Sequence, residues 1–269
     1  MTSSQLPTPF GDEPCKDKHL TRAPLARVLA QLRFEPLSAL GSPNVTSEFA
    51  ARLSKKYPYL ETGSEFNLLI GSGQVSPQSS QNPVWRFRSP DRLTTVSLTN
   101  GSLALETTQY AGRTDFCKDL AQIADVLKNV AYVPAYTRVG YRYTNRISES
   151  NDLGILSELV RPEILGISAA GLDGNAHLVH SLSQAAFDLA NGDGFLAQWG
   201  EMPANGTFDP SLDLLPGRSW ILDLDAFQQG VSIGSDPEEI RVQSERLSKR
   251  AYRFFRWAVT PRFLIRFGG

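Results

Sequence analysis

The sequence has few of the residues that usually carry metal or covalent chemistry. Its 269 residues include three histidines and two cysteines. His177 and His180 would point to opposite faces of a strand, and no Cys, Asp or Glu accompanies them at ligand spacing. Serine hydrolases need a placed histidine base, and no nucleophile-elbow pattern occurs. The Gly-rich pieces form no phosphate-binding or dinucleotide pattern. We therefore expect no metal, no cofactor and no catalytic residue.

Long apolar runs and a disulfide framework are also missing. No stretch approaches the ~20 apolar residues of a membrane span. Residues 1–14 have neither the basic start nor the apolar centre of a signal peptide. Cys15 and Cys117 are too few for a disulfide framework. These absences favour a protein of the reducing cytoplasm with no membrane contact.

The chain has almost no net charge, but its charges are unevenly distributed. The formal net charge is −1. Residues 151–235 contain 2 basic and 11 acidic side chains, whereas residues 236–269 contain 8 basic and 4 acidic ones. Such polarity favours complementary surfaces, either within the fold or toward a partner. It does not by itself indicate nucleic acid, which usually needs a strongly basic domain.

The first part of the chain predicts a strand, a short helix, several short strands and a long helix. Asn100-Gly101 is its strongest hairpin signal, and Thr114 is the expected N-cap of the long helix. The expected elements are strand 25–34, helix 48–57, strand 66–75, loop 76–83, strands 84–89, 93–99 and 103–110, and helix 114–134.

The second part repeats this order. A long helix should begin at Asp236-Pro237-Glu238-Glu239, which has a capping Asp, a Pro in the first turn and acids near the positive end of the dipole. The other expected elements are strand 136–147, helix 153–165, strands 176–189 and 195–202, loop 205–217 and strand 220–227.

The recurring order predicts an α+β fold of two pseudo-duplicated units. Each unit is a strand, a helix, antiparallel strands and a long helix, and together they form one curved antiparallel sheet backed by helices. Residues 1–21 would be a flexible leader, 22–134 the first half and 135–269 the second, in one compact domain. This order resembles the TATA-box-binding-protein-like fold, a resemblance of architecture that carries no function.

Seven stretches, in order along the chain, also carry a family resemblance. They are residues 23–25, 33–34, 85–87, 103–108, 136–147, 159–163 and 252–258. Together they resemble a sporadically distributed family of bacterial proteins of about 250 residues, and the resemblance spans the chain from residue 22. The family has no assigned reaction, so the resemblance implies no catalytic residue. Its sporadic distribution implies accessory genes, such as defence or toxin–antitoxin loci.

The candidate binding residues are arginines on predicted strands. Side chains alternate along a strand, so Arg138, Arg142 and Arg146 should share one face, and Arg27 should extend the row from the first half. This row predicts a site for phosphate or nucleic acid. The alternative is a scaffold in which carboxylates such as Asp223 balance the arginines.

Three kinds of function remain open from the sequence. The leading hypothesis is a non-enzymatic binding or regulatory protein that holds an anionic ligand or nucleic acid on the arginine-bearing face. The second is a protein of the antitoxin or defence kind that binds a partner protein through the acidic region 151–235. The third is an enzyme or small-molecule carrier with a cavity between sheet and helix.

Overall fold

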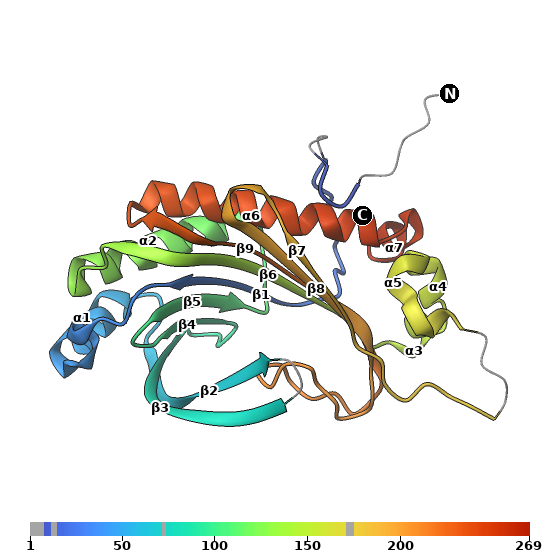
Figure 1. Ribbon diagram of the computed structural model, residues 1–269, viewed down its shortest axis with the longest axis horizontal. Coiled ribbons are helices and arrows are strands. Elements are labelled where there is room, and N and C mark those ends of the chain that lie inside the picture. The colour runs from blue at the N-terminus through green and yellow to red at the C-terminus, as the bar shows by residue number, and fades with distance from the viewer. Residues whose placement is uncertain (1–7, 12–14, 72–73, 171–174) are drawn as a thin grey trace. The chain divides into compact units, whose positions relative to one another are not determined.

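The computed structural model describes residues 8–11, 15–71, 74–170 and 175–269 (Figure 1). The side chains of residues 64–82 and 231 lie outside this description. The described chain forms an open antiparallel sheet with helices packed on it. The predicted α+β class is therefore confirmed.

The strands of the described chain are β1 (Leu25–Arg33), β2 (Tyr59–Gly71), β3 (Gln74–Arg88), β4 (Thr94–Leu98), β5 (Ser102–Thr107), β6 (Ala135–Ile147), β7 (Ser183–Asp188), β8 (Asp193–Met202) and β9 (Ser219–Gly234). The α-helices are α1 (Pro43–Leu53), α2 (Arg113–Ala131), α3 (Ser150–Leu153), α4 (Leu156–Leu159), α5 (Pro162–Leu165), α6 (Pro237–Ala258) and α7 (Pro261–Arg266). Short 3₁₀ turns lie at Ser38–Gly41, Gly166–Ala169 and Ala190–Gly192.

The strand order in the sheet follows the repeated element order. Among the described residues it is β2-β3-β4-β5-β1-β6-β9-β8-β7. In each predicted half, the first strand neighbours the last strand of the same half, β1 beside β5 and β6 beside β9. The two first strands, β1 and β6, are themselves adjacent. This mirrored order is what a duplicated unit produces, although superposition of the halves stays a prediction.

Internal packing divides the chain into two units. Unit 1 comprises the described parts of residues 1–27, 142–226 and 247–269, and unit 2 comprises those of residues 28–141 and 227–246.

The core of unit 2 follows from alternation along its strands. On β1, Val28, Ala30 and Leu32 are buried while the side chains between them are only partly covered. Strand β5 pairs with β1 in antiparallel register and alternates in the same way. Helix α2 buries the apolar stripe that includes Leu120 and Leu127, so its helical periodicity predicted its packing face correctly.

The core of unit 1 is built around the second half of α6. Leu247, Ala251 and Phe254 are buried on one stripe of this helix. The Tyr143 hydroxyl of β6 shares a hydrogen bond of 2.7 Å with Ser248 of α6, so the strand and the helix are joined by a buried polar contact as well as by apolar packing. Beyond α6, an isolated bridge pairs Val160 with Val259 and places the short helices beside the end of α6 (Figure 1).

Two short connections behave as the sequence predicts. The Asn100-Gly101 pair lies in the turn between β4 and β5, where the Thr99 amide donates to the Ser102 carbonyl at 2.9 Å. The carboxylate of Asp236 accepts hydrogen bonds from the amides of Glu238 and Glu239 at the start of α6. Both predictions are confirmed, because each depends only on hydrogen bonds between residues that are close together in the chain.

The predicted loop over residues 76–83 is wrong, because these residues belong to β3. Strand β3 pairs with β2 along its length, while β4 pairs only with the end of β3 from Trp85 to Arg88. Pro77 and Pro83 therefore lie where one edge of β3 is unpaired, and proline is tolerated at such an edge because it has no N–H to donate. The turn residues 72–73 between β2 and β3 lie outside the described residues.

The ends of several other helices and strands also differ from the predicted ones. Helix α1 begins at Pro43 and ends at Leu53, so Tyr57 lies in the following turn. Pro162 begins α5, which makes the expected helix 153–165 three short helices. The expected strand 176–189 is shorter, since β7 spans only Ser183–Asp188. The N-cap of α2 is Gly112 and not Thr114.

Candidate functional site

Two of the predicted arginines lie in a charge cluster in unit 1. Alternation on β6 puts Arg142 and Thr144 on the same side, and both contact Asp223 of β9. The Arg142 Nε donates to both oxygens of Asp223 at 2.9 and 2.8 Å, and the Thr144 hydroxyl donates at 2.7 Å. Asp223 is only 1% exposed. Arg142 and Thr144 therefore lie on the same face of β6, and the partner of Arg142 is a carboxylate of the same unit.

The loop between β8 and β9 supplies the second carboxylate of the cluster. Asp209 accepts from Arg27 Nη2 at 2.5 Å and lies 3.1 Å from Arg142 Nη1. Ser211 contacts the guanidinium of Arg27 and donates through its hydroxyl to Asp209 at 2.6 Å. The guanidinium of Arg142 also lies 5.8 Å from the centre of the Phe208 ring. Two arginines thus share one carboxylate, and the second carboxylate balances them.

Burial and charge act in opposite directions on this cluster. Burial opposes the charge of Arg142, but Asp223 and Asp209 outweigh it and hold the pKa of Arg142 above its ordinary value. Burial would also raise the pKa of Asp209, yet Arg27 and Arg142 lower it to about 2. Burial raises the pKa of Asp223, whereas its hydrogen bonds from Arg142 and Thr144 favour the anion. The cluster is held by mutual neutralisation in a low-dielectric site.

The other two predicted arginines lie outside this cluster. Arg146 donates to the Asp213 carbonyl at 2.6 Å and to the Ser219 hydroxyl at 3.2 Å, and burial lowers its pKa. Arg138 belongs to unit 2, where its guanidinium lies 4.7 Å from the centre of the Phe227 ring. The structure therefore brings Arg27 and Arg142 together but places the other two in different surroundings. These contacts favour the scaffold alternative, and ligand binding by the four arginines stays a prediction.

Asp223 and Asp225 are two residues apart on β9 and so share one face of the strand, where two carboxylates could serve acid–base chemistry. The carboxylate of Asp223 is buried and accepts three hydrogen bonds from two side chains of its own unit. A general base must reach the proton that it removes from a substrate. An occupied, buried carboxylate of this kind is suited to scaffolding and not to proton transfer.

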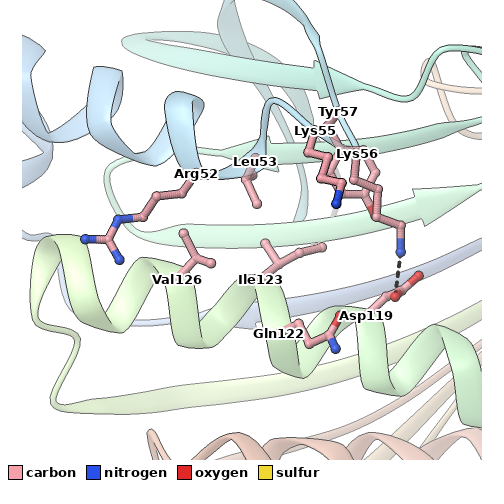
Figure 2. A pocket seen from close by; sticks show the side chains of 9 residues that line it. All are labelled: Arg52, Leu53, Lys55, Lys56, Tyr57, Asp119, Gln122, Ile123 and Val126. Carbon is pink, nitrogen blue, oxygen red and sulfur yellow. Dashed lines mark ion pairs between the residues drawn. The ribbon is translucent and has the colours of Figure 1, made fainter.

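A groove in unit 2 offers a more accessible site. It lies between the C-terminal end of α1, the turn that follows it, and the middle of α2, and its volume is about 430 Å³ (Figure 2). Ligand pockets commonly have volumes of ~300–1,000 Å³. The groove is lined by Arg52, Leu53, Lys55, Lys56, Tyr57, Asp119, Gln122, Ile123 and Val126.

The groove combines a cationic rim with an apolar floor. In Figure 2, Arg52 lies at one end, the lysines and Asp119 lie at the other, and Leu53, Ile123 and Val126 lie between them. The packing of α1 on α2 explains the floor, because both helices turn apolar side chains toward each other here. The rim comes from three cations that the chain places within five residues.

The rim holds more positive than negative charge. Lys56 pairs with Asp119 at 2.6 Å, and Arg52 pairs with Glu48 at 2.6 Å within α1. Lys55 is exposed and forms no ion pair with any residue that the structure describes. The Arg52–Glu48 pair is exposed and the Lys56–Asp119 pair is partly exposed, so each contributes only about 0–1 kcal/mol and a ligand could replace it at little cost. Lys55 could therefore pair with an anionic ligand directly, and Arg52 and Lys56 could do so by leaving their present partners.

Tyr57 gives the groove a buried hydrogen-bond donor. Its residue is 2% exposed, and its hydroxyl has no hydrogen-bond partner among the described residues. Burial, with the nearby charge of Asp119, raises the pKa of Tyr57, so the hydroxyl keeps its proton at neutral pH. Buried phenol hydroxyls usually find an acceptor. A ligand oxygen in the groove would provide one.

Sequence reasoning missed this groove, although a signal was present. Arg52, Lys55 and Lys56 form the densest cationic cluster in the first hundred residues. We expected a helix as far as Tyr57, which would have spread these side chains around a helical surface. The helix ends at Leu53 instead, and the amides of Lys56 and Tyr57 turn back to the Leu53 carbonyl. The turn gathers the cations on one side.

Other chemistry-bearing residues form no recognisable centre within the described part of the chain. Within it, no three His, Cys, Asp or Glu side chains are grouped so that they could hold a metal ion. His177 and His180 are exposed, and Cys117 is buried in α2. None of the described helices combines the length and apolarity needed to cross a membrane.

Comparison with known proteins adds no relative. The sequence matches no protein-family model and no curated protein. Function must therefore be argued from the two sites themselves.

Proposed function

We propose that this chain is a non-enzymatic binding protein for a small organic anion, held in the groove between α1 and α2. The observation that carries the proposal is the surplus positive charge of a groove lined by Tyr57, whose buried hydroxyl lacks an acceptor among the described residues. An anion with an apolar body satisfies every feature at once. Its acidic group would accept from Tyr57 and pair with Lys55, and its body would cover Leu53, Ile123 and Val126.

Small carboxylates and phosphate esters fit this groove better than nucleic acid does. Nucleic acid binding depends on many phosphate contacts along an extended basic surface. Three cations line the groove, whose volume is about 430 Å³, and the chain as a whole has a net charge of −1. A single acidic group is enough to use these cations.

A pair of dyes tests the proposal. 8-Anilinonaphthalene-1-sulfonate and N-phenyl-1-naphthylamine share their ring system, and only the first carries an anionic group. We expect Lys55→Glu to weaken sulfonate binding about tenfold, since a charge-assisted contact contributes about 1.5–3 kcal/mol. Binding of the neutral dye should change little. Fluorescence titration measures both dissociation constants.

The matched control is Lys249→Glu, which reverses the charge of another exposed lysine, on α6. It should leave binding of both dyes unchanged. Tyr57→Phe should weaken sulfonate binding without opening a cavity, because it removes only the hydroxyl. Equal effects of the two lysine substitutions, or equal loss of both dyes, would show that the groove does not recognise an anion.

The alternative functions remain proposals with their own tests. A protein of the antitoxin or defence kind would form a stoichiometric complex with the product of a neighbouring gene, through the acidic region 151–235. A cytoplasmic location follows from the cysteine usage and is proposed together with the binding function. Purification of the chain with its neighbouring gene products tests the partner hypothesis, and recovery of the chain alone counts against it.

A further inference from the structure

The N-terminal segment of unit 1 packs on α6 through an aromatic anchor. The Phe10 ring lies 4.8 Å from Phe187, 5.3 Å from Phe195 and 5.8 Å from Phe254, measured between ring centres. Phe195 and Phe254 are buried and stack on each other at 4.9 Å. Phe10 therefore occupies a site that β7, β8 and α6 build from three aromatic rings.

Three hydrogen bonds between described residues reach the main chain of this segment. Arg256 Nη1 donates to the Lys16 carbonyl at 2.9 Å, and Arg253 Nε donates to the Thr8 carbonyl at 3.4 Å. The Tyr252 hydroxyl accepts from the Lys18 amide at 2.7 Å. Main-chain contacts of this kind do not depend on which side chains the bound segment carries. The aromatic and basic residues between positions 252 and 256 thus form a surface that holds a peptide backbone.

The charge of this surface limits the peptides that fit it. From Leu247 onward, the chain carries six basic residues and no acidic residue, and two of them, Arg253 and Arg256, contact the N-terminal segment. In the sequence, the acidic residues Asp12 and Glu13 follow the anchor Phe10 within three positions. A peptide with an aromatic anchor and nearby acidic residues therefore complements the aromatic rings and the positive charge of this surface.

We propose that Phe187, Phe195, Phe254 and the side chains of Tyr252, Arg253 and Arg256 form a peptide-docking site, here named the α6 peptide site. Its partner is an extended acidic peptide of another protein with an aromatic anchor, and the chain's own N-terminal segment occupies the site until such a peptide replaces it. An attached segment acts at an effective concentration on the order of millimolar, so the wild-type chain resists weak competitors. The site uses none of the residues of the α1–α2 groove.

The experiment uses the full chain with Phe10→Ala, which removes the anchor from its own segment. The probe is a fluorescein-labelled peptide with the sequence of residues 6–18 in which Ser replaces Cys15. Fluorescence anisotropy should show binding to the Phe10→Ala chain and at least tenfold weaker binding to the wild type. The same peptide with Ala at its anchor should not bind. Adding Arg256→Glu to the Phe10→Ala chain should weaken binding.

A second peptide tests the class of partner. It keeps the phenylalanine and the two acids at their spacing and scrambles every other position, and we expect it to bind as the first peptide does. If the first peptide binds and the scrambled peptide does not, the site recognises only the chain's own segment, and the proposal of a partner peptide from another protein is overturned. Equal binding of the anchorless peptide, or no binding to a Phe10→Ala chain that circular dichroism shows to be folded, would overturn the docking site itself. If Phe10→Ala fails to fold, Phe10→Leu removes the ring of the anchor but keeps an apolar side chain there, and it gives the same comparison with the site residues intact.

Discussion

At the scale of single residues, Arg142 shows how a strand pattern finds a side chain without finding its role. Period-two alternation placed Arg142 on the polar side of β6. The same alternation on β9 presents Asp223 to it, and both oxygens of that carboxylate accept from Arg142 Nε. A row of arginines along one strand suggests unpaired positive charge. In the fold, Asp223 of β9 and Asp209 of the loop between β8 and β9 neutralise Arg142.

Replacing Arg142 with Ala should lower the free energy of unfolding by about 3–5 kcal/mol, because it leaves Asp223 buried without its cation. A chemical denaturation curve measures the change, and Lys249→Ala serves as the exposed control. Replacing Arg142 with Met and Asp223 with Leu together should recover most of the loss, since an apolar pair has no unpaired charge. A small effect of Arg142→Ala would return this arginine to the ligand-binding hypothesis.

Tyr57 is the residue-scale feature that the sequence could not reveal. A tyrosine before a proline is unremarkable in a sequence, and its importance lies in an acceptor that the described fold does not provide. Only the packing of α1 against α2 determines which hydroxyls are buried and which of them are satisfied.

At the scale of elements, hydrogen bonds between near neighbours in the chain determine where α6 begins and where β4 turns into β5. The Asp236 cap and the Asn100-Gly101 turn lie where the sequence put them, because their hydrogen bonds join residues at most three apart in the chain. The part of β3 over residues 76–83 was missed because it is identified only by its pairing with β2, and a segment rich in Ser, Gln and Pro gives no sign of that pairing.

Replacing Asp236 with Ala should lower the free energy of unfolding by about 1 kcal/mol, because two amides of the first turn of α6 lose their acceptor. Asp236→Asn should keep most of the stability, since its amide oxygen can still accept these bonds. Thermal or urea denaturation of the two variants separates the loss of the cap from the loss of charge. Equal destabilisation by both substitutions would assign the effect to the helix dipole instead.

At the scale of the whole molecule, the mirrored strand order agrees with the predicted duplication. A sheet in which β1 neighbours β5 while β6 neighbours β9 has two similarly connected parts. The resemblance to the TATA-box-binding-protein-like fold and to a sporadic bacterial family stays a prediction, as do the boundaries at residues 22 and 134.

We expect residues 22–134 and 135–262 to superpose as two similar units in an experimental structure. The physical reason is that the same order of strand, helix, strands and helix can close on itself in only a few ways when connections are short and do not cross. Halves with different strand connections, or with helices on opposite faces of their strands, would count against a duplication.

The sequence by itself determined the α+β class, the long helices α2 and α6, the hairpin at Asn100 and the alternation on β6. Each of these depends on hydrophobic periodicity or on hydrogen bonds between near neighbours in the chain. Only the tertiary structure decided that Asp209 and Asp223 neutralise Arg27 and Arg142, and that the residues around Tyr57 form a groove. These contacts join residues from 63 to 182 positions apart. Whether a charge is neutralised and whether a side chain is buried depend on neighbours that the fold brings together. These neighbours lie far apart in the chain, so no short stretch of sequence reveals them.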